Sequence, residues 1–465
     1  MTITQLGVPL VATSAAQAPD AMAEDTSAPA LAGWADRLAA PDDGDKPLRG
    51  LAVAVVGLGY VGLPTALSLW AAGATVLGLD VSERRLRDIR TGSVDLLPAQ
   101  HAALACTESA GDFLLTTDTD VLREADAVIV CVPTPVTPAY EPDLAALRAA
   151  CATVVERAVP GQLLVLTSTS HVGTTRELLL EPLARRELTA EQEVLVAFAP
   201  ERIDPGNATH TPERTPRVVG GAGPLSTRAA ALLLRPTASR IHEVQGPETA
   251  EMAKLWENVF RAVNIALANE LSDACGHLGL SPIPVIEAAG TKPYGFMPFY
   301  PGPGAGGHCI PCDPYYLLGR LPGDGTSAPL VHTAMRALRE RPARITGQAA
   351  ELLAADGLVP AGARVLVLGV AYKAGVSDVR ESPALRLLSL LRDQGTDAHY
   401  SDGHVPTLTV DGRDLVSVAR PQDTEWDLVI VHTVHPGTDL DWLDTVPRVL
   451  DTRQRVRPHA PAGTR

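Results

Sequence analysis

The stretch from Leu51 to Asp80 constrains the fold of this chain more than any other feature. An apolar run leads into the turn Gly57-Leu-Gly-Tyr-Val-Gly62, a helical pattern follows, and a second apolar run ends at Asp80. In such a turn the first glycine permits the tight bend, Gly59 lets the backbone approach a pyrophosphate, and Gly62 lets the helix pack on the strand. The sequence therefore predicts a parallel β-α-β unit that binds a dinucleotide.

Asp80 indicates which dinucleotide this is. It follows the second strand about 20 residues after the turn, where a carboxylate accepts hydrogen bonds from the hydroxyls of the adenosine ribose. The same charge would repel a 2′-phosphate, which favours NAD over NADP. The unpaired amides at the start of the helix face the phosphates. We predict NAD as the cofactor, held by Asp80 and by the turn residues Gly57, Gly59, Tyr60, Val61 and Gly62.

The N-terminal half continues the strand–helix alternation, and a long helical stretch separates it from a second pattern of the same kind. Further strands are expected over residues 127–132, 163–167 and 194–197. Alternation of this kind indicates a parallel sheet that helices cover on both faces. The separating helix is expected over residues 248–278, after Pro247, because proline is favoured at a first helical position. The second pattern has strands over 364–370, 398–400 and 427–432 and a helix over 383–394.

The predicted fold class is α/β, with two Rossmann-like, doubly wound parallel-sheet domains joined by a long-helix connector domain. Residues 1–48 are rich in Ala, Pro, Asp and Ser and lack a sustained period, which is typical of a disordered extension, here with a short helix near residues 31–38. The predicted domains are this extension over 1–48, an NAD-binding domain over 49–243, a central helical domain over 244–345 and a C-terminal α/β domain over 346–465.

Charge and cysteine content exclude several classes of partner. The formal net charge of −15 argues against a nucleic acid or an anionic membrane as the main partner. No apolar run approaches the roughly 20 residues that span a bilayer, and no Lys or Arg precedes the mild apolar stretch at the N-terminus, so neither a membrane span nor a signal peptide is expected. Six irregularly spaced cysteines do not make a disulfide framework, which indicates a reduced, cytoplasmic setting.

The most unusual stretch is PGPGAGGHCIPCDPYYL, over residues 301–317. Its glycines let the backbone approach a ligand closely and leave the thiol of Cys309 unshielded. Cys309 and Cys312 have the spacing of a redox pair or of half a zinc site. The chain has no second CxxC and no HxxxH, so no metal site is predicted. The third interpretation is that the Cys309 thiolate attacks a carbonyl bound beside NAD.

The long helix supplies polar groups that suit this third interpretation. Lys254 and Asn258 are four residues apart and therefore share one helix face. Projecting together, they could polarise a substrate oxygen and stabilise an oxyanion. Thr134 stands between two prolines just past a predicted strand, at the sheet edge that borders the ligand crevice. We therefore take Thr134 as a candidate hydroxyl beside the substrate or the cofactor.

Six segments occur in an order that is similar to a known family: VVGLGYVGLP, VPTPV, APERIDPG, ETAEMAKLWENVFRAVNIALANEL, PGPGAGGHCIPCDP and GVAYKAGVSDVRESP. They resemble the UDP-glucose/GDP-mannose dehydrogenase family from about residue 50 onward. The forms PERIxPG and GGHCIPxDP are most similar to the branch that oxidises UDP-N-acetylhexosamines. Val172 stands where the family commonly has proline, and the segment before Pro301 matches only at its end, so the identity of the sugar stays open.

The resemblance implies an NAD-dependent, four-electron oxidation of the C6 hydroxyl of a nucleotide sugar to the carboxylate. Hydride loss gives an aldehyde, Cys309 adds to it as a thiohemiacetal, a second hydride loss gives a thioester, and water hydrolyses the thioester. The substrate implied is UDP-GlcNAc or UDP-ManNAc, with UDP-glucose as the alternative. A two-electron hydroxyacid-type dehydrogenase, and a nucleotide-sugar-binding protein without activity, are the other functions considered.

The resemblance also implies roles for residues of the matching motifs. Cys309 matches the nucleophile, and Asp313 matches the acid that orients or activates water. Lys254 and Asn258 match the pair that stabilises the oxyanion and holds the substrate, and Glu201 matches the carboxylate near the hydrolytic water. The C-terminal domain is expected to bind the nucleotide sugar, and a homodimer or higher homo-oligomer is expected to form on the long helix. The other predicted substrate contacts are Thr134, Arg202, Tyr300, Gly304, His308, Lys373 and Arg380, the last often across a subunit interface in the family.

Overall fold

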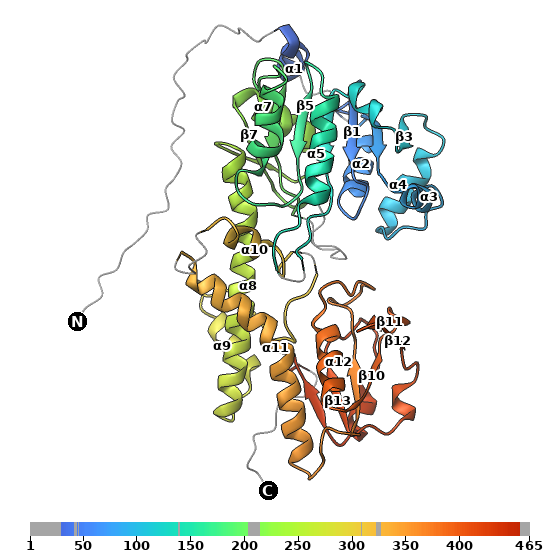
Figure 1. The fold of residues 1–465 in the computed structure, drawn as a ribbon, viewed down its shortest axis with the longest axis vertical. Helices are drawn as coiled ribbons and strands as arrows, with labels where there is room; N and C mark the ends of the chain where they lie inside the picture. Colours follow the sequence, from blue (N-terminus) through green and yellow to red (C-terminus); the bar gives the residue numbers. More distant parts are fainter. Residues whose placement is uncertain are drawn as a thin grey trace, which may run out of the picture.

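A computed structural model describes residues 29–40, 44, 46–137, 140–202, 214–307, 309–321 and 327–455. Two α/β units lie one above the other, and long helices run between them (Figure 1). Within the described residues no helix is both long and apolar enough to cross a membrane. The α/β class with two Rossmann-like domains and a helical connector is confirmed.

The first unit is built on an eight-stranded sheet with the order β3-β2-β1-β4-β5-β6-β7-β8. Neighbouring strands are parallel except β6 and β7, which pair antiparallel, so the sheet is mixed rather than fully parallel. Its strands are β1 (Ala52–Val56), β2 (Thr75–Leu79), β3 (Phe113–Thr116), β4 (Ala127–Val130), β5 (Leu163–Leu166), β6 (Leu195–Phe198), β7 (Arg217–Gly221) and β8 (Ile241–Val244).

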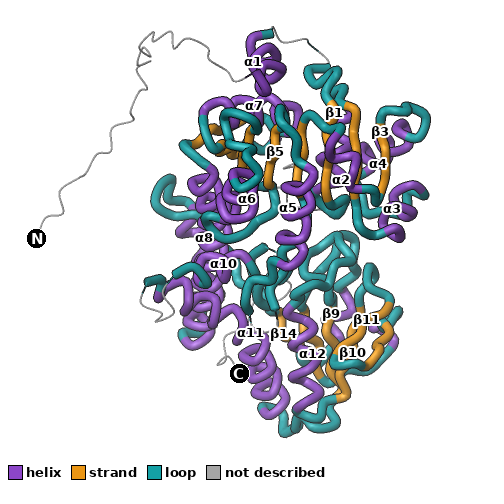
Figure 2. Tube along the Cα trace, turned by 45° about the horizontal axis from the view of Figure 1, so that its top comes forward, coloured by secondary structure: helices purple, strands orange, loops and turns teal. Residues whose placement is uncertain are grey.

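Helices cover both faces of this sheet (Figure 2). Alternate strand residues point to opposite faces. Val53 and Val55 therefore join the core under α2 and α7, whereas Ala54 and Val56 join the core under α5. The helices of this unit are α1 (Ala32–Ala39), α2 (Gly62–Ala71), α3 (Glu83–Arg90), α4 (Pro98–Thr107), α5 (Ala145–Arg157), α6 (Glu181–Ala184) and α7 (Pro224–Leu234).

Part of the predicted extension is folded. The 3-10 turn Pro29–Leu31 and helix α1 follow the sequence expectation of a short helix, and they pack on the first unit. Leu31 and Trp34 are three residues apart, share one face and are both buried in its core. The Trp34 indole Nε1 donates to the carbonyl of Gly161, at 3.1 Å. The segment that precedes β1 is thus anchored at the sheet's amino-terminal edge.

Four helices connect the two units: α8 (Pro247–His277), α9 (Pro282–Gly290), α10 (Asp313–Leu318) and α11 (Pro329–Ala354). Helix α8 matches the long helix expected from the sequence, and Figure 1 shows it running from the first sheet past α10 to α9. Leu255 and Val259 on α8 and Leu338 on α11 join the same core as α5. The connector is therefore continuous with the first unit's core.

The second unit has a four-stranded parallel sheet in the order β10-β9-β13-β14, with a separate hairpin of β11 and β12. Val365 and Val367 face α11 and α12, whereas Leu366 and Leu368 face Trp426 and the 3-10 turn Asp441–Thr445. Its elements are β9 (Arg364–Leu368), α12 (Pro383–Asp393), β10 (Asp397–Ser401), β11 (Thr407–Val410), β12 (Arg413–Val416), β13 (Leu428–Val431) and β14 (Val449–Asp451).

Candidate active site

The glycine turn between β1 and α2 has little room for side chains at two of its three glycines. Gly57 has φ of +88°, and a Cβ there would lie 2.8 Å from the carbonyl oxygen of Cys131. A Cβ on Gly62 would lie 1.8 Å from the oxygen of Gly57, so the helix could not approach the strand this closely. At Gly59 a Cβ would meet no atom within 4 Å. The open side of the turn thus lies where a pyrophosphate would approach the amides of α2.

The carboxylate of Asp80 is held against this turn. One oxygen accepts the backbone N–H of Leu58 and the other accepts that of Ser82, both at 2.9 Å. Each carboxylate oxygen has two lone pairs, so these bonds leave acceptor capacity for ribose hydroxyls. Arg85 donates from Nε to the carbonyl of Leu58 at 2.8 Å and fixes the turn from its other side. The residues present fit the adenosine half of NAD.

A buried polar group joins two of the sequence motifs. Lys254 and Asn258 on α8 are 7% and 4% exposed, and Asp313 at the start of α10 is 3% exposed. Asn258 donates from Nδ2 to the Asp313 carboxylate. Burial raises the pKa of Asp313 to about 6, although the Lys254 charge and the Asn258 hydrogen bond both oppose the rise. The structure therefore brings Lys254 and Asn258 together with Asp313, which follows Asn258 by 55 positions in the sequence.

Cys309 lies in the turn that leads into α10, four positions before Asp313, and is exposed. Its carbonyl accepts the backbone N–H of Cys312 at 3.2 Å and that of Asp313 at 2.8 Å, which closes a turn into the helix. Cys312 is buried, and burial, with the nearby charge of Asp313, raises the pKa of its thiol to about 12. Of the two thiols in this motif, Cys309 is therefore the one that a substrate can reach.

The glycines before Cys309 have a packing role that the sequence analysis did not predict. A Cβ on Gly306 would lie 2.7 Å from Cβ of Tyr372, and one on Gly307 would lie 2.8 Å from the Tyr372 ring. A Cβ on Gly304 would lie 3.0 Å from Pro383. The glycines let the Cys309 loop pack closely against the second α/β unit, and only part of the loop is left to face a substrate.

Helix α10 is tied to the loop after β4. The buried Tyr316 donates from its hydroxyl to the carbonyl of Pro135 at 3.0 Å, and it also hydrogen-bonds with Thr134, the candidate hydroxyl. Burial raises the pKa of the Tyr316 hydroxyl, so it stays protonated. The sequence analysis missed Tyr316, whose only local signal is its place in the apolar end of the cysteine motif. It sets the Thr134 loop beside the Cys309 helix.

Glu201 and Arg202 follow β6, and both side chains contact the start of β7. Glu201 Oε2 lies 3.0 Å from Nη2 of Arg217, and Oε1 accepts the backbone N–H of Arg202 at 2.8 Å. The Arg202 guanidinium pairs with Glu257 at 2.7 Å and donates to the carbonyl of Pro216. Arg202 was predicted to contact substrate, but its side chain is bound by protein groups and ties the β6 loop to α8.

Three predicted contacts lie on the second unit or close to it. The Arg380 guanidinium lies 5.0 Å from the ring centroid of Tyr60, and its Nε donates to Asp378 at 2.9 Å. Within one chain, Arg380 therefore reaches the cofactor turn. Tyr300 packs against the guanidinium of Arg455, 4.3 Å from its ring centroid. Lys373 is half-buried just after β9, and His308 lies outside the described residues.

Sequence analysis also missed Glu251. It is 1% exposed on α8, and its carboxylate accepts the backbone N–H groups of Gly173 and Thr175 at 2.6 and 2.8 Å. Burial raises its pKa despite these hydrogen bonds. Glu251 lies three positions before Lys254, and it ties α8 to the segment that follows Val172. It lies in the second turn of the helix, where no local pattern distinguishes it from the nearby Glu248.

A dinucleotide turn, together with an exposed cysteine that closely precedes a buried lysine–asparagine–aspartate group, is typical of an NAD-dependent oxidoreductase. The chain belongs to the UDP-glucose/GDP-mannose dehydrogenase family. It matches that family's NAD binding domain over residues 51–237, its central domain over 248–337 and its UDP binding domain over 366–458. It is thus an NAD-dependent nucleotide-sugar dehydrogenase.

Several relatives cover most of the chain. It is 35% identical over 351 residues to the UDP-N-acetyl-D-mannosamine dehydrogenase of Escherichia coli (strain K12), which spans 73% of this chain and 82% of that protein. It is 32% identical over 420 residues to the NDP-N-acetyl-D-galactosaminuronic acid dehydrogenase of Ralstonia solanacearum, across 86% and 95% of the two chains. The structure of the UDP-D-ManNAc dehydrogenase of Pyrococcus horikoshii is similar at a TM-score of 0.80 and 32% identity, over 89% of this chain and 97% of that one.

Proposed function

We propose that this enzyme oxidises C6 of a UDP-N-acetylhexosamine to the carboxylate in two successive steps. The observation that carries the proposal is the exposed Cys309 in the turn that leads into α10. The first residue of this helix, Asp313, is hydrogen-bonded to Asn258 beside Lys254. A two-electron dehydrogenase has no use for such a cysteine. The choice of an N-acetylated sugar is supported by the relatives, which are named as UDP-N-acetyl-D-mannosamine and NDP-N-acetyl-D-galactosaminuronic acid dehydrogenases.

Each residue of the site has a chemical task in this proposal. NAD, held by the glycine turn and Asp80, supplies the hydride acceptor. Lys254 and Asn258 hold the sugar oxygen as negative charge develops on it. The Cys309 thiolate forms a C–S bond to the aldehyde carbon, which keeps the intermediate in the site between the two oxidations.

The last step of the proposed reaction hydrolyses the thioester. Water bonds to the acyl carbon as the C–S bond breaks and the Cys309 thiolate leaves. Glu201 takes one water proton, and Asp313 orients the attacking molecule. The other water proton stays on the new carboxyl group and passes to solvent when the acid product ionises. We place the uridine diphosphate on the C-terminal domain, over residues 346–465, near Lys373, and this assignment is supported by the match to the family's UDP binding domain.

An assay of substrate and stoichiometry tests this function. UDP-GlcNAc, UDP-ManNAc, UDP-glucose and GDP-mannose are incubated separately with NAD, and both NADH and acid are measured. We expect two NADH per sugar with one of the N-acetylated substrates and no acid from Cys309→Ser. One NADH per sugar, unaffected by Cys309→Ala, would instead support the two-electron alternative. A clear preference for UDP-glucose would support the other branch of the family.

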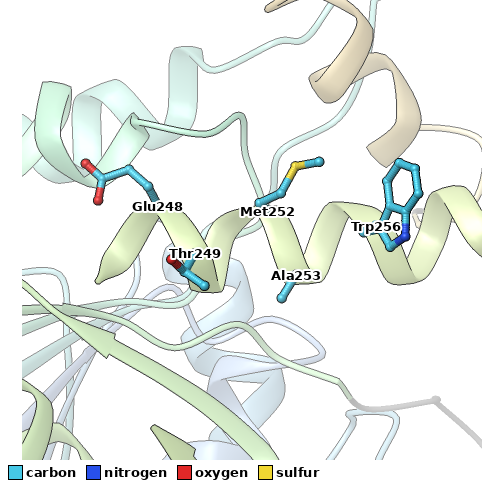
Figure 3. A pocket seen from close by; sticks show the side chains of 5 residues that line it. All are labelled: Glu248, Thr249, Met252, Ala253 and Trp256. Atoms are coloured by element: carbon cyan, nitrogen blue, oxygen red, sulfur yellow. The ribbon is translucent and has the colours of Figure 1, made fainter. Parts of the chain in front are cut away.

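We also propose a homodimer formed along α8 and α9. Trp256, Phe260 and Leu267 recur along one face of α8 and are 55%, 43% and 61% exposed. Such a stripe of large apolar side chains is unusual on a surface that stays in water. The stripe continues from a shallow hollow lined by Glu248, Thr249, Met252, Ala253 and Trp256 (Figure 3).

Oligomeric state is the test of this surface. We expect the wild-type enzyme to have the mass of a dimer or a larger assembly by light scattering, and the double variant Trp256→Glu/Leu267→Glu to be monomeric. Val359→Glu, which replaces a side chain 66% exposed outside this stripe, is the control. A wild-type monomer would contradict the proposal.

The free cysteines of the described chain and the use of NAD support a cytoplasmic setting.

A further inference from the structure

A buried arginine that the family motifs do not single out reaches Glu201. Arg217 is the first residue of β7, and its side chain is only 5% exposed. Arginine is almost never fully buried unless its charge is paired, because desolvating an unpaired guanidinium is costly. The position of Arg217 therefore has to be understood from its partners.

The partners of Arg217 come from the segments that precede and follow β7, and they include the carbonyl of Ala199, which accepts from Nη2 at 3.5 Å. Nη2 lies 3.0 Å from Glu201 Oε2, just after β6. Nη1 donates to the hydroxyl of Thr237 at 3.1 Å, and that hydroxyl in turn donates to the carbonyl of Leu234 at 2.8 Å. Because Thr237 uses its own proton on Leu234, its oxygen can only accept from Arg217. The guanidinium is thus held in one orientation on the side away from the carboxylate.

Glu201 is oriented from both of its oxygens. Oε2 pairs with Arg217, and Oε1 accepts the backbone N–H of Arg202. Arg202 is itself fixed by Glu257 on α8, next to Asn258. The Glu201 side chain is 14% exposed, so it keeps one access to the crevice.

The Arg217–Glu201 pair lies at the carboxyl edge of the sheet. Burial raises the pKa of the Cys131 thiol, which follows β4. The charges of the pair also act on this thiol, that of Arg217 lowering its pKa and that of Glu201 raising it. Cys131 also lies against the cofactor turn, since a Cβ on Gly57 would touch the Cys131 carbonyl and one on Gly62 would lie 3.2 Å from the Cys131 Cβ. The pair is therefore next to the cofactor turn and to the loop that carries Thr134.

We infer that Arg217 is a positioning residue for hydrolysis of the thioester, and this inference rests on the proposed function. Arg217 holds the Glu201 carboxylate in the position from which, in the proposed reaction, it takes a proton from the water that attacks the acyl carbon. Loss of Arg217 then slows the step in which Glu201 takes the water proton, while the two hydride transfers, which do not use that proton, keep their rates.

The test separates the oxidations from the hydrolysis. The enzyme is used at a concentration high enough for the NADH of a single turnover to be detected. It is mixed with NAD and the nucleotide sugar that the wild type oxidises, and NADH formation is followed by stopped flow. For Arg217→Met we expect a burst of two NADH per active site at nearly the wild-type rate, then turnover slower by about a hundredfold, the scale of one general base. Intact-mass spectrometry should show the acyl group on Cys309. Arg217→Lys, which keeps the charge, should recover about tenfold of the loss.

Two further comparisons rule out a merely structural role. If Arg217 acts only through Glu201, then Arg217→Met/Glu201→Gln hydrolyses no more slowly than Glu201→Gln alone. Arg228→Met, which replaces an exposed arginine on α7, is the matched control and should behave as wild type. Arg217→Lys replaces Arg217→Met in the cycle if the methionine variant does not fold.

The outcomes are distinct. The role of Arg217 would be overturned if the burst rate and the steady-state turnover rate fell by the same factor in Arg217→Met. It would also be overturned if the losses in hydrolysis rate of the two single variants multiplied in the double variant. Full-rate bursts without an acyl adduct would overturn it as well. If the wild-type enzyme forms no NADH from any sugar of the panel, the proposed function itself is wrong, and this result differs from every outcome for the variants.

Discussion

At the residue scale, the two cysteines of one motif differ in their surroundings more than in their chemistry. Cys309 is exposed at the turn, and Cys312 is buried against the start of α10. Since the thiolate is the reactive form, burial that raises the pKa of Cys312 to about 12 leaves it protonated at neutral pH. Spacing alone could not separate a redox pair from a nucleophile with a passive neighbour, whereas burial favours the second.

Alkylation distinguishes these two thiols directly. We expect iodoacetamide at neutral pH to modify Cys309 and leave Cys312 unmodified in the folded enzyme, because Cys309 is exposed whereas Cys312 is buried and its raised pKa keeps it protonated. Peptide mass spectrometry after a short reaction measures both. Activity should fall in step with modification of Cys309, and Cys312→Ser should keep most of the wild-type activity. Equal modification of both thiols, or inactivation that tracks Cys312, would contradict this assignment.

The buried Asp313 gives stability a particular dependence on pH. Its folded pKa is about 6, raised from an ordinary value of 3.8, so the folded protein binds more protons than the unfolded chain between these values. Stability from this group is therefore present at low pH and is lost as pH rises through the folded pKa. The shift corresponds to about 3 kcal/mol.

The Asp313→Asn variant isolates this contribution. Relative to wild type, its free energy of unfolding should improve by about 3 kcal/mol between pH 4 and pH 7, since it lacks the ionisation. Denaturant titrations of both proteins at the two pH values give the difference. The wild-type pH–rate profile should also have an acid limb near pH 6, because the ionised carboxylate is the form that accepts from Asn258. A difference in free energy of unfolding between the two proteins that does not change with pH would contradict the raised pKa of Asp313.

At the element scale, the Cys309 loop depends on glycine where it meets the second α/β unit. Gly307 has φ of +80°, and its Cα faces the Tyr372 ring, so a methyl group brings both backbone strain and a clash. Gly307→Ala should destabilise the packing of the two units by about 2 kcal/mol. KM for the nucleotide sugar should rise about tenfold. Gly302→Ala, where a Cβ meets no atom within 4 Å, is the control and should change KM little.

The elements found from the sequence are those with a local signal. The unit β1–α2–β2 has apolar runs and a glycine turn, α8 has a proline start and an apolar stripe, and the second unit repeats the same alternation. Strand β7 escaped detection because it is short, ends in two glycines and pairs antiparallel with β6. Helix α11 escaped because it contains Pro342, which ordinarily interrupts a helix.

The same division holds for the site. Lys254, Asn258 and Asp313 belong to compact motifs, so their residue types could be found before their contact was known. Tyr316 and Arg217 act across long separations in the chain, through a carbonyl of the β4 loop and a carboxylate after β6. Such pairs have no periodicity or spacing of their own, and only the folded arrangement shows them.

At the scale of the whole molecule, the two edges of the first sheet have different tasks. The carboxyl edge holds the glycine turn, the Thr134 loop and Glu201, and it faces the connector helices. The amino edge is covered by α1, which contacts the chain at Gly161, before β5, and at Gly50, before β1. Figure 1 shows α1 at the end of this unit remote from the second one. Stability and catalysis should therefore be separable by changes in α1.

Trp34→Ala tests this separation. The indole is 3% exposed and donates to the carbonyl of Gly161, so its loss creates a cavity and leaves a buried acceptor without that donor. We expect the free energy of unfolding of the N-terminal unit to fall by about 3 kcal/mol. We expect kcat and KM at 25 °C to stay within about twofold of the wild-type values. Denaturant unfolding and steady-state kinetics measure the two effects, and Asp36→Ala, on the exposed side of α1, is the control. A large loss of kcat at temperatures where the variant remains folded would show that the amino edge of the sheet influences the distant site, and that the two edges are coupled through the strands.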